Sequence, residues 1–287
     1  MKRHIYNLNV LNEWSPGLAY VLGLALTDGS VRKDLARICF YSSDQQMLEI
    51  VKNFFESTRP IVPHSQPGKY LEYGSYPGKK QMYVFYIDSK QAVERFCQLG
   101  ITPNKSYVGP YPHVPQDLWW HYFRGIFDGD GNINFSRKTG LRITIAGNRN
   151  CVLGLQSDLA RLFCIHSVAR YLDEDRVKTL DLLGKHAERA LILLYQDSEG
   201  LRLERKYNQW LEWNQHFKFM TNCLLCDVPL RASKGEKLCP SCRVIRNRLM
   251  NRRSDHYRRK GIWMSLRDLC QPEENHLPVE RLDLYLE

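Results

Sequence analysis

The sequence predicts a mixed α+β protein made of two pseudo-symmetric halves with antiparallel sheets, followed by a small C-terminal module. Three observations lead to this prediction. An apolar segment ending in Asp-Gly occurs twice at an offset of 102 residues, which matches Gly23 with Gly125 and Asp28 with Asp130. A similar order of helix-like and strand-like segments follows each copy. Two Cys-x-x-Cys pairs then appear near the C-terminus. The predicted boundaries are 1–109, 110–218 and 219–287.

The first half reads as helix, hairpin, helix, hairpin, helix (αββαββα). After Asp28 the residues alternate with period two, which is typical of a sheet with one solvated face. Asp44 is placed to cap the next helix, and Gly100 to end the third one. The predicted elements after the apolar helix are a hairpin within 29–43, a helix at 44–55, strands at 69–73 and 82–87, and a helix at 90–99.

The second half repeats this order after a proline-rich linker at 101–114. The predicted elements are strands at 132–136 and 141–146, a helix at 150–163, strands at 167–172 and 177–182, and helices at 185–195 and 202–213.

The two apolar segments predict a pair of helices that cross closely. A glycine inside a helix is unfavourable by roughly 0.5–1 kcal/mol, so Gly23 and Gly125 at the same place suggest contact between the two backbones. Each helix would then end at its aspartate, and the carboxylates of Asp28 and Asp130 would lie side by side. The alternative is an ordinary pair of buried helices, each ended by an Asp-Gly turn. Two copies in register, each followed by a strand-like segment, favour the crossing.

Both segments resemble the signature helices of the LAGLIDADG homing endonucleases, and the chain resembles the single-chain form with two motifs. The penultimate acid of the motif is present in both copies, as Asp28 and Asp130. The sixth position, which is variable in that family, is Leu26 in the first copy and Asp128 in the second. The resemblance implies a monomer that binds double-stranded DNA and makes a double-strand break at a long asymmetric target, in the homing of a mobile intron or similar element.

The resemblance also implies a metal-dependent hydrolysis of the phosphodiester. Asp28 and Asp130 would hold Mg²⁺ or Mn²⁺, because hard cations prefer oxygen ligands and one carboxylate per ion suffices when phosphates supply others. Lys105 and Lys206, which lie 101 residues apart, would polarise the water or stabilise the transition state. Solvated surface lysines are the alternative, and Arg205 competes with Lys206 for the second role.

The chain is basic, with a net charge of +10, which indicates a polyanionic partner and would also fit an anionic membrane surface. The hairpins are the expected DNA-reading surface, because a two-stranded ribbon fits the major groove. Each side chain alone is as well explained as a phosphate contact or a solvated rim charge. The candidates are Arg32, Lys33, Arg37, Lys69, Tyr73, Lys79, Lys80 and Tyr83 in the first half, and Arg137, Lys138, Arg142, Arg170, Arg176 and Lys178 in the second.

The spacing Cys223-x-x-Cys226 and Cys239-x-x-Cys242 predicts a structural Zn²⁺ site with four thiolates, the alternative being a redox pair. Residues 221–260 hold eleven Lys or Arg against three Asp or Glu, so the module is predicted to present a basic helix to phosphates. The candidate contacts are Arg243, Arg246, Arg248, Arg252, Arg253, Arg258, Arg259 and Lys260. The segment from Trp263 onward turns apolar and acidic and has no predicted role.

The N-terminus lacks the apolar core of a signal peptide, and no run of eighteen apolar residues occurs, so an intracellular protein of the cytoplasm or an organelle matrix is expected, with no membrane partner. The alternative function is a non-cleaving nucleic-acid-binding protein of the same fold, either a transcription regulator or a maturase that binds intron RNA. An intein is not expected, because the chain starts with Met1 and does not end in His-Asn.

Overall fold

The computed structural model describes residues 4–64, 81–105, 109–136, 140–170, 178–217, 219–226, 229–231, 237–271 and 279. These residues divide into two compact units. The first comprises residues 1–135 and 141–209, and the second comprises residues 136–140 and 210–287. The predicted first half lies wholly in the first unit, and so does the predicted second half except for residues 136–140 and 210–218, which belong to the second unit. Within the described residues, no helix is long and apolar enough to cross a membrane.

The first half begins with α1 (Pro16–Thr27), whose start is set by local chemistry. The Ser15 side chain accepts a hydrogen bond from the Leu18 amide at 3.1 Å, and Pro16 occupies the first helical position. The residues from Leu18 to Leu26 are buried on every side, as expected for a helix at the centre of a domain. The other helices of this half are α2 (Gln45–Phe54), capped by Asp44, and α3 (Lys90–Gln98), capped by Ser89.

The first sheet is antiparallel with the order β1-β2-β4-β3. Its strands are β1 (Gly29–Val31), β2 (Ile38–Ser42), β3 (Val62–His64) and β4 (Met82–Ile87). Strand β3 was not predicted, because Pro63 argues against a strand. At the edge of the sheet, however, a proline needs no ladder donor on its outer side. The strand predicted at 69–73 lies outside the described residues.

The second half repeats this arrangement with α5 (Trp119–Asp130), α6 (Arg149–Phe163) and α7 (Lys185–Tyr195). Its sheet has the order β5-β6-β8-β7. The strands are β5 (Gly131–Ser136), β6 (Gly140–Gly147), β7 (Val168–Arg170) and β8 (Lys178–Leu183). The predicted mixed architecture with two four-stranded antiparallel sheets is thus confirmed.

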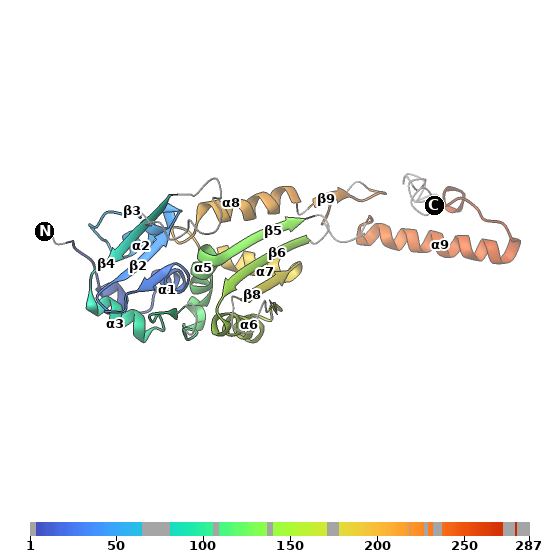
Figure 1. The fold of residues 1–287 in the computed structure, drawn as a ribbon. Coiled ribbons are helices and arrows are strands. Elements are labelled where there is room, and N and C mark those ends of the chain that lie inside the picture. Colours follow the sequence, from blue (N-terminus) through green and yellow to red (C-terminus); the bar gives the residue numbers. More distant parts are fainter. Residues whose placement is uncertain are drawn as a thin grey trace, which may run out of the picture. The chain divides into compact units, whose positions relative to one another are not determined.

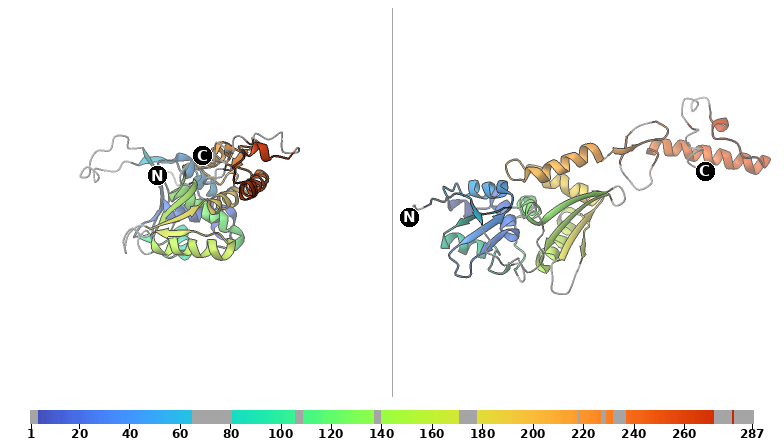
Figure 2. Two further views of the ribbon diagram at one scale, coloured as in Figure 1. Left: turned by 90° about the vertical axis from the view of Figure 1, so that its right-hand side faces the viewer. Right: turned by 45° about the horizontal axis from the view of Figure 1, so that its top comes forward.

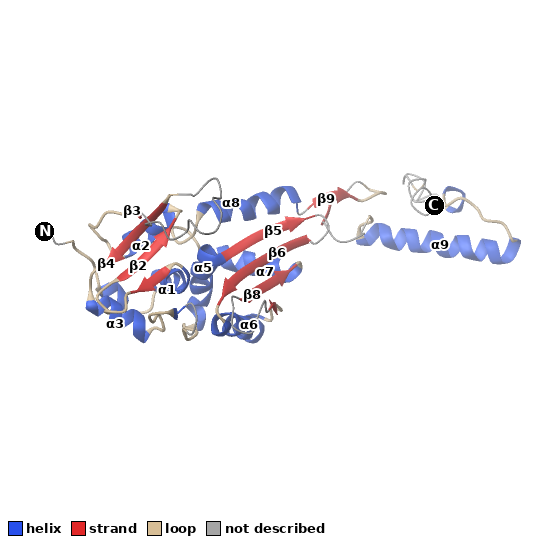
Figure 3. Ribbon diagram, in the orientation of Figure 1, coloured by secondary structure: helices blue, strands red, loops and turns tan. Residues whose placement is uncertain are grey.

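Helices α1 and α5 pack against each other where the two halves meet, and each half places its remaining helices on one face of its own sheet (Figures 1 and 3). Ile38 and Phe40 of β2 are fully buried beneath these helices, as are Ile143 and Ile145 of β6. The opposite face of each sheet carries the alternate side chains. This second face is turned away from the helices of its half (Figure 2).

The second compact unit contains β9 (Phe219–Asn222), paired with β10 (Pro229–Arg231), and the long helix α9 (Pro240–Lys260). Its small core consists of buried residues from the cysteine pairs, α9 and the C-terminal segment. These are Cys223, Leu225, Leu238, Cys242, Leu249, Leu266 and Val279. The tail therefore supplies part of the core of this unit. Helix α8 (Glu204–Glu212) spans the boundary between the units.

Candidate active site

The crossing of α1 and α5 leaves no room for a side chain at either glycine. A Cβ atom added to Gly23 would lie 2.8 Å from the amide nitrogen of Ile126 and 2.9 Å from the Cα of Gly125. A Cβ atom added to Gly125 would lie 3.0 Å from the Cα of Gly23. The backbones themselves are therefore in contact, and this contact holds the ends of the two helices next to each other.

Asp28 and Asp130 lie at these neighbouring helix ends. Asp28 follows the last residue of α1, and Asp130 is the last residue of α5. The Asp28 carboxylate receives a hydrogen bond from Thr27 Oγ1 at 3.0 Å and lies against the position that a Cβ atom of Gly129 would occupy. The structure thus brings the two acids together, as the duplicated segments predict.

Burial and nearby charges shift the pKa of both carboxylates. Burial, and then the negative charge of Asp130, raise the pKa of Asp28 to about 6, against a favourable hydrogen bond from Thr27. Burial also raises the pKa of Asp130, while the positive charges of Lys105 and Lys206 lower it. Ionisation of both neighbouring carboxyl groups is unfavourable in this buried site, and a bound cation would stabilise the ionised forms.

Both predicted lysines lie beside this pair of acids. Lys105 donates a hydrogen bond from Nζ to the carbonyl oxygen of Thr27 at 3.2 Å. Its burial lowers its pKa, and the charges of Asp130 and Asp28 oppose that shift. The ammonium group therefore sits at the C-terminus of α1, where the partial negative charge of the helix favours a cation.

Lys206 occupies the corresponding place at the end of α5, but it is held more tightly. Its Nζ donates to the carbonyl oxygens of Phe127, Asp128 at 2.9 Å and Gly131 at 2.6 Å. An ammonium group has three N–H donors, so these three carbonyls engage all of them. Burial lowers the pKa of Lys206 to about 8.

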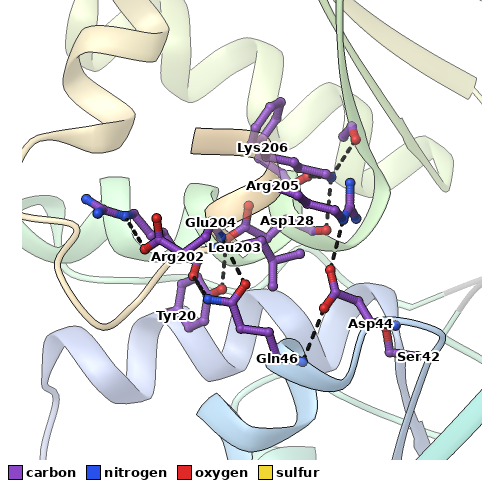
Figure 4. A network of polar contacts seen from close by, with 12 residues as sticks. Tyr20, Ser42, Asp44, Gln46, Asp128, Arg202, Leu203, Glu204, Arg205 and Lys206 are labelled. Atoms are coloured by element: carbon purple, nitrogen blue, oxygen red, sulfur yellow. Dashed lines mark hydrogen bonds and ion pairs between the residues drawn. The ribbon is translucent and has the colours of Figure 1, made fainter. Parts of the chain in front are cut away.

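Arg205, the competitor of Lys206, points elsewhere. Its Nε donates to Asp44 Oδ2 at 2.8 Å, and Asp44 is the residue that caps α2 in the first half (Figure 4). The Arg205 side chain is 57% exposed, whereas Lys206 is buried. Of the two neighbours, only Lys206 contacts the end of α5.

Each lysine segment is tied to the opposite half of the protein. Gln46 at the start of α2 donates to the carbonyl oxygen of Arg202 at 3.4 Å and accepts from the amide of Glu204 at 3.0 Å (Figure 4). In the reciprocal contact, Asn148, which caps α6, donates to the carbonyl oxygen of Lys105 at 2.7 Å. The halves therefore position each other's lysines.

Asp128 forms a buried polar site that the sequence analysis did not assign. Its Oδ2 accepts hydrogen bonds from Tyr20 Oη at 2.8 Å and from the amide of Leu203 at 3.0 Å, while its buried Oδ1 has no partner among the described residues. Burial raises the pKa of Asp128 to about 6. The first half has the apolar Leu26 at this motif position, and that difference was the available signal.

We expect Asp128→Asn to change how stability depends on pH. The folded-state pKa of Asp128 lies above its ordinary value near 3.8, so the folded protein holds this proton more tightly than the unfolded chain does. The contribution to stability is therefore full below pH 3.8 and is lost as the pH rises through about 6. The wild type should lose on the order of 2 kcal/mol relative to Asp128→Asn across this window. Urea unfolding of both proteins between pH 4 and 7 measures this difference, and parallel profiles would contradict it.

The predicted DNA-contacting side chains of the hairpins occupy several environments. Arg32, 54% exposed, pairs with Asp34, and Lys33 is also exposed. Arg37 pairs with Asp88 and lies over the ring of Tyr86. Arg142 and Arg170 lie on the second sheet and pair with Asp181.

Two further hairpin candidates, Tyr83 and Lys178, lie on the described strands. Tyr83 shares a face of β4 with the core residues Phe85 and Ile87, because alternate residues of a strand point the same way. Lys178 begins β8. The remaining candidates, Lys69, Tyr73, Lys79, Lys80, Arg137, Lys138 and Arg176, lie outside the described residues.

The four cysteines of the C-terminal module converge on one point. The Sγ atoms of Cys223, Cys226, Cys239 and Cys242 all lie within 4.8 Å of one another. The Sγ atoms of Cys226 and Cys239 are 3.7 Å apart, close to the ~3.8 Å expected between two ligands of a tetrahedral Zn²⁺ with Zn–S bonds of about 2.3 Å. The residues therefore fit a zinc ion, and Cys239 also caps the start of α9.

We expect Cys239→Ser to release the metal and to unfold this module. Zinc ligation and folding are coupled in small modules of this kind, and the core here is small. Metal analysis of the purified protein should find about one zinc per chain in the wild type and less in the variant. Cys97→Ser, at a single cysteine on α3, is the matched control. Absence of zinc from the intact protein would contradict the assignment.

The basic residues of α9 are mostly open to solvent. Arg243, Arg248, Arg258, Arg259 and Lys260 are exposed, and Arg246 is partly exposed. Two others also stabilise the module. Arg252 donates to the carbonyl oxygen of Leu269 at 3.1 Å, and Arg253 lies 5.5 Å from the ring centre of Trp263.

No protein-family model and no curated protein matches this sequence. Solved structures similar to the chain include full-length WhiA from Thermatoga maritima, with 12% identity and a TM-score of 0.45 over 87% of this chain and 74% of that one. They also include I-DmoI in complex with DNA and Ca, with 14% identity and a TM-score of 0.45 over 71% and 98% of the chains. A third is the LAGLIDADG homing endonuclease I-GzeII in complex with its DNA target, with 10% identity and a TM-score of 0.47 over 71% and 89%.

Proposed function

We propose that this chain is a metal-dependent DNA endonuclease that makes a double-strand break at a long asymmetric target, as in the homing of a mobile intron. The observation that carries the proposal is the pairing of Asp28 and Asp130 at the ends of two crossing helices, each with a buried lysine beside it. One acid comes from each half. A pair of acids related in this way suits the two strands of a duplex, which are themselves related by approximate twofold symmetry.

The donor set at this site fits Mg²⁺ or Mn²⁺. Asp28 and Asp130 offer carboxylate oxygens, and a bound cation would offset both the burial and the charge of Asp130 that raise the pKa of Asp28. Such an ion, when bound, supplies an activated water and neutralises charge on the phosphate. Asp28 and Asp130 would hold it.

The two lysines are proposed to act differently. Within the described residues, the ammonium group of Lys105 makes one hydrogen bond, to the carbonyl oxygen of Thr27, and the charges of both acids act on it. It is therefore suited to polarise the water or to stabilise the transition state. The three N–H donors of the Lys206 ammonium group all bind carbonyl oxygens around the end of α5. We assign it chiefly to holding Asp130 in position.

The sheets are proposed to read double-stranded DNA with their faces opposite the helices, and the zinc module to add phosphate contacts through α9. Arg37, Arg142 and Arg170 of the sheets and the exposed basic residues of α9 supply the positive charge that this partner requires.

Cleavage of a randomised DNA library tests the proposal. The purified protein is incubated with the library and Mg²⁺, and the ends that it creates are sequenced. We expect double-strand breaks at one family of related sites, and none when EDTA replaces Mg²⁺. Sequence-selective binding without any cleavage would instead assign the chain to the non-cleaving alternative, a transcription regulator. Selective binding of intron RNA over the DNA library would assign it to a maturase.

A further inference from the structure

The outer face of the second sheet carries a cluster built around one buried acid. Thr144 on β6 lies opposite Asp181 on β8, and Arg142 and Arg170 lie on the same face from β6 and β7. Asp181 is completely buried although it is on the face turned away from the core residues Ile143 and Leu180. The side chains around it, and not the protein core, exclude the solvent.

Both oxygens of the Asp181 carboxylate contact neighbouring side chains. Oδ1 accepts from Arg142 Nε at 3.1 Å and from Thr144 Oγ1 at 2.8 Å. Oδ2 accepts from Arg142 Nη2 at 2.7 Å and forms an ion pair with Arg170, whose Nε lies 2.6 Å away. Three hydrogen bonds and one ion pair thus engage both carboxylate oxygens with side chains of this cluster. Asp181 is a positioning residue that holds two arginines.

The arginines keep donors for another partner. Arg142 uses Nε and one N–H of Nη2 on Asp181, and this pairing leaves the edge formed by Nη1 and the second N–H of Nη2. Arg170 pairs through Nε. Their side chains remain 35% and 56% exposed, and the cluster carries a net charge of +1. Two parallel N–H groups at the free edge match two adjacent acceptors, such as O6 and N7 of guanine in the major groove.

We propose that Asp181 fixes Arg142 as a guanine-reading side chain, and Arg170 as its neighbour on the duplex, so that this cluster determines sequence preference in one half of the target. The inference rests on the proposed binding of DNA by the sheets. Pre-orientation matters because a free arginine side chain loses rotamer entropy when DNA orders it, and Asp181 orders this one before DNA arrives.

Two variants separate base reading from attraction to phosphate. Arg142→Lys keeps the positive charge but loses the planar guanidinium group. We therefore expect a 5- to 100-fold loss of preference for guanine at one or two positions in one half of the site. This range corresponds to the loss of a bidentate arginine–guanine pair, about 1–3 kcal/mol. Non-specific affinity and its salt dependence should stay the same. Asp181→Asn removes one negative charge, so it should weaken the same preference while non-specific binding becomes tighter.

The measurement is selection of bound sequences from a randomised duplex library without divalent metal, with full-length protein and a salt series on non-specific DNA. Glu49→Gln is the matched control, because it removes one negative charge from the Glu49–Lys52 pair on the exposed side of α2. The inference is overturned if Arg142→Lys keeps the guanine preference. It is also overturned if this variant changes only the salt dependence of non-specific DNA binding, because such a change indicates a phosphate contact. If the wild type selects no sequence, the proposed function fails instead.

Discussion

Replacing Asp28 or Asp130 by asparagine is expected to abolish double-strand cleavage, with a loss of about 10³-fold or more in each variant. Such a loss corresponds to about 4 kcal/mol of transition-state stabilisation, which is the scale of a bound metal ion's contribution. Asparagine keeps the shape of the side chain but removes the negative charge that holds the cation. DNA binding should persist, since the contacts proposed for DNA come mostly from the sheets and from α9. Cleavage is measured by gel under single-turnover conditions, and binding by fluorescence anisotropy.

The stability of these variants distinguishes lost chemistry from lost folding. The pKa of Asp28 is raised to about 6, so above that pH the ionised carboxylate costs the folded state free energy. Asp28→Asn should therefore melt at the same temperature as the wild type or higher at pH 7.5. The matched control is Asp117→Asn, the same change at an exposed acid beyond the opposite end of α5. Undiminished cutting by either active-site variant would refute the assignment.

Gly23→Ala and Gly125→Ala are expected to destabilise the protein strongly, against the trend of helix propensity. Alanine in place of glycine inside a helix ordinarily stabilises by about 1 kcal/mol. Here the new Cβ of Gly125→Ala would lie 3.0 Å from the Leu24 amide nitrogen and from the Cα of Gly23, and the backbone cannot yield as a side chain can. Separating α1 from α5 should cost about 2 kcal/mol or more and should also move the two acids apart.

Urea unfolding measures this cost, and Gly17→Ala is the control on the same helix. A Cβ atom there would meet the ring of Phe54 at 2.9 Å, and that half-exposed side chain can turn aside. We expect the control to stay within about 1 kcal/mol of the wild type and to keep its cleavage activity. If Gly23→Ala and Gly125→Ala are as stable as the wild type, the close crossing is wrong.

The features that the sequence predicted are those encoded in short stretches of chain. Helix and strand order followed from periodicity, and the four cysteines followed from their spacing. The helix crossing was suggested by two glycines in register, because a glycine is unfavourable inside a helix unless the backbones must approach closely. The strand β3 was not predicted. Its residue Pro63 is unfavourable in a central strand, and only the structure shows that β3 lies at the edge of the sheet, where a proline is tolerated.

Only the tertiary structure distinguished Lys206 from Arg205. The two are adjacent in sequence, and their roles separate because one side chain faces the carbonyls at the end of α5 while the other reaches Asp44, 161 residues away. The same holds for Asp181, whose two arginines come from neighbouring strands, and for Asp128, whose partners Tyr20 and Leu203 lie on other elements.

The sequence by itself determined the duplicated halves, their helices and strands, the pair of acids and the cysteine cluster. Each of these depends on periodicity or spacing that a few residues express locally. The tertiary structure decided which polar groups meet inside the protein. Those pairings depend on how helices cross and strands align, and a buried charge is stable only where distant parts of the chain supply its partners.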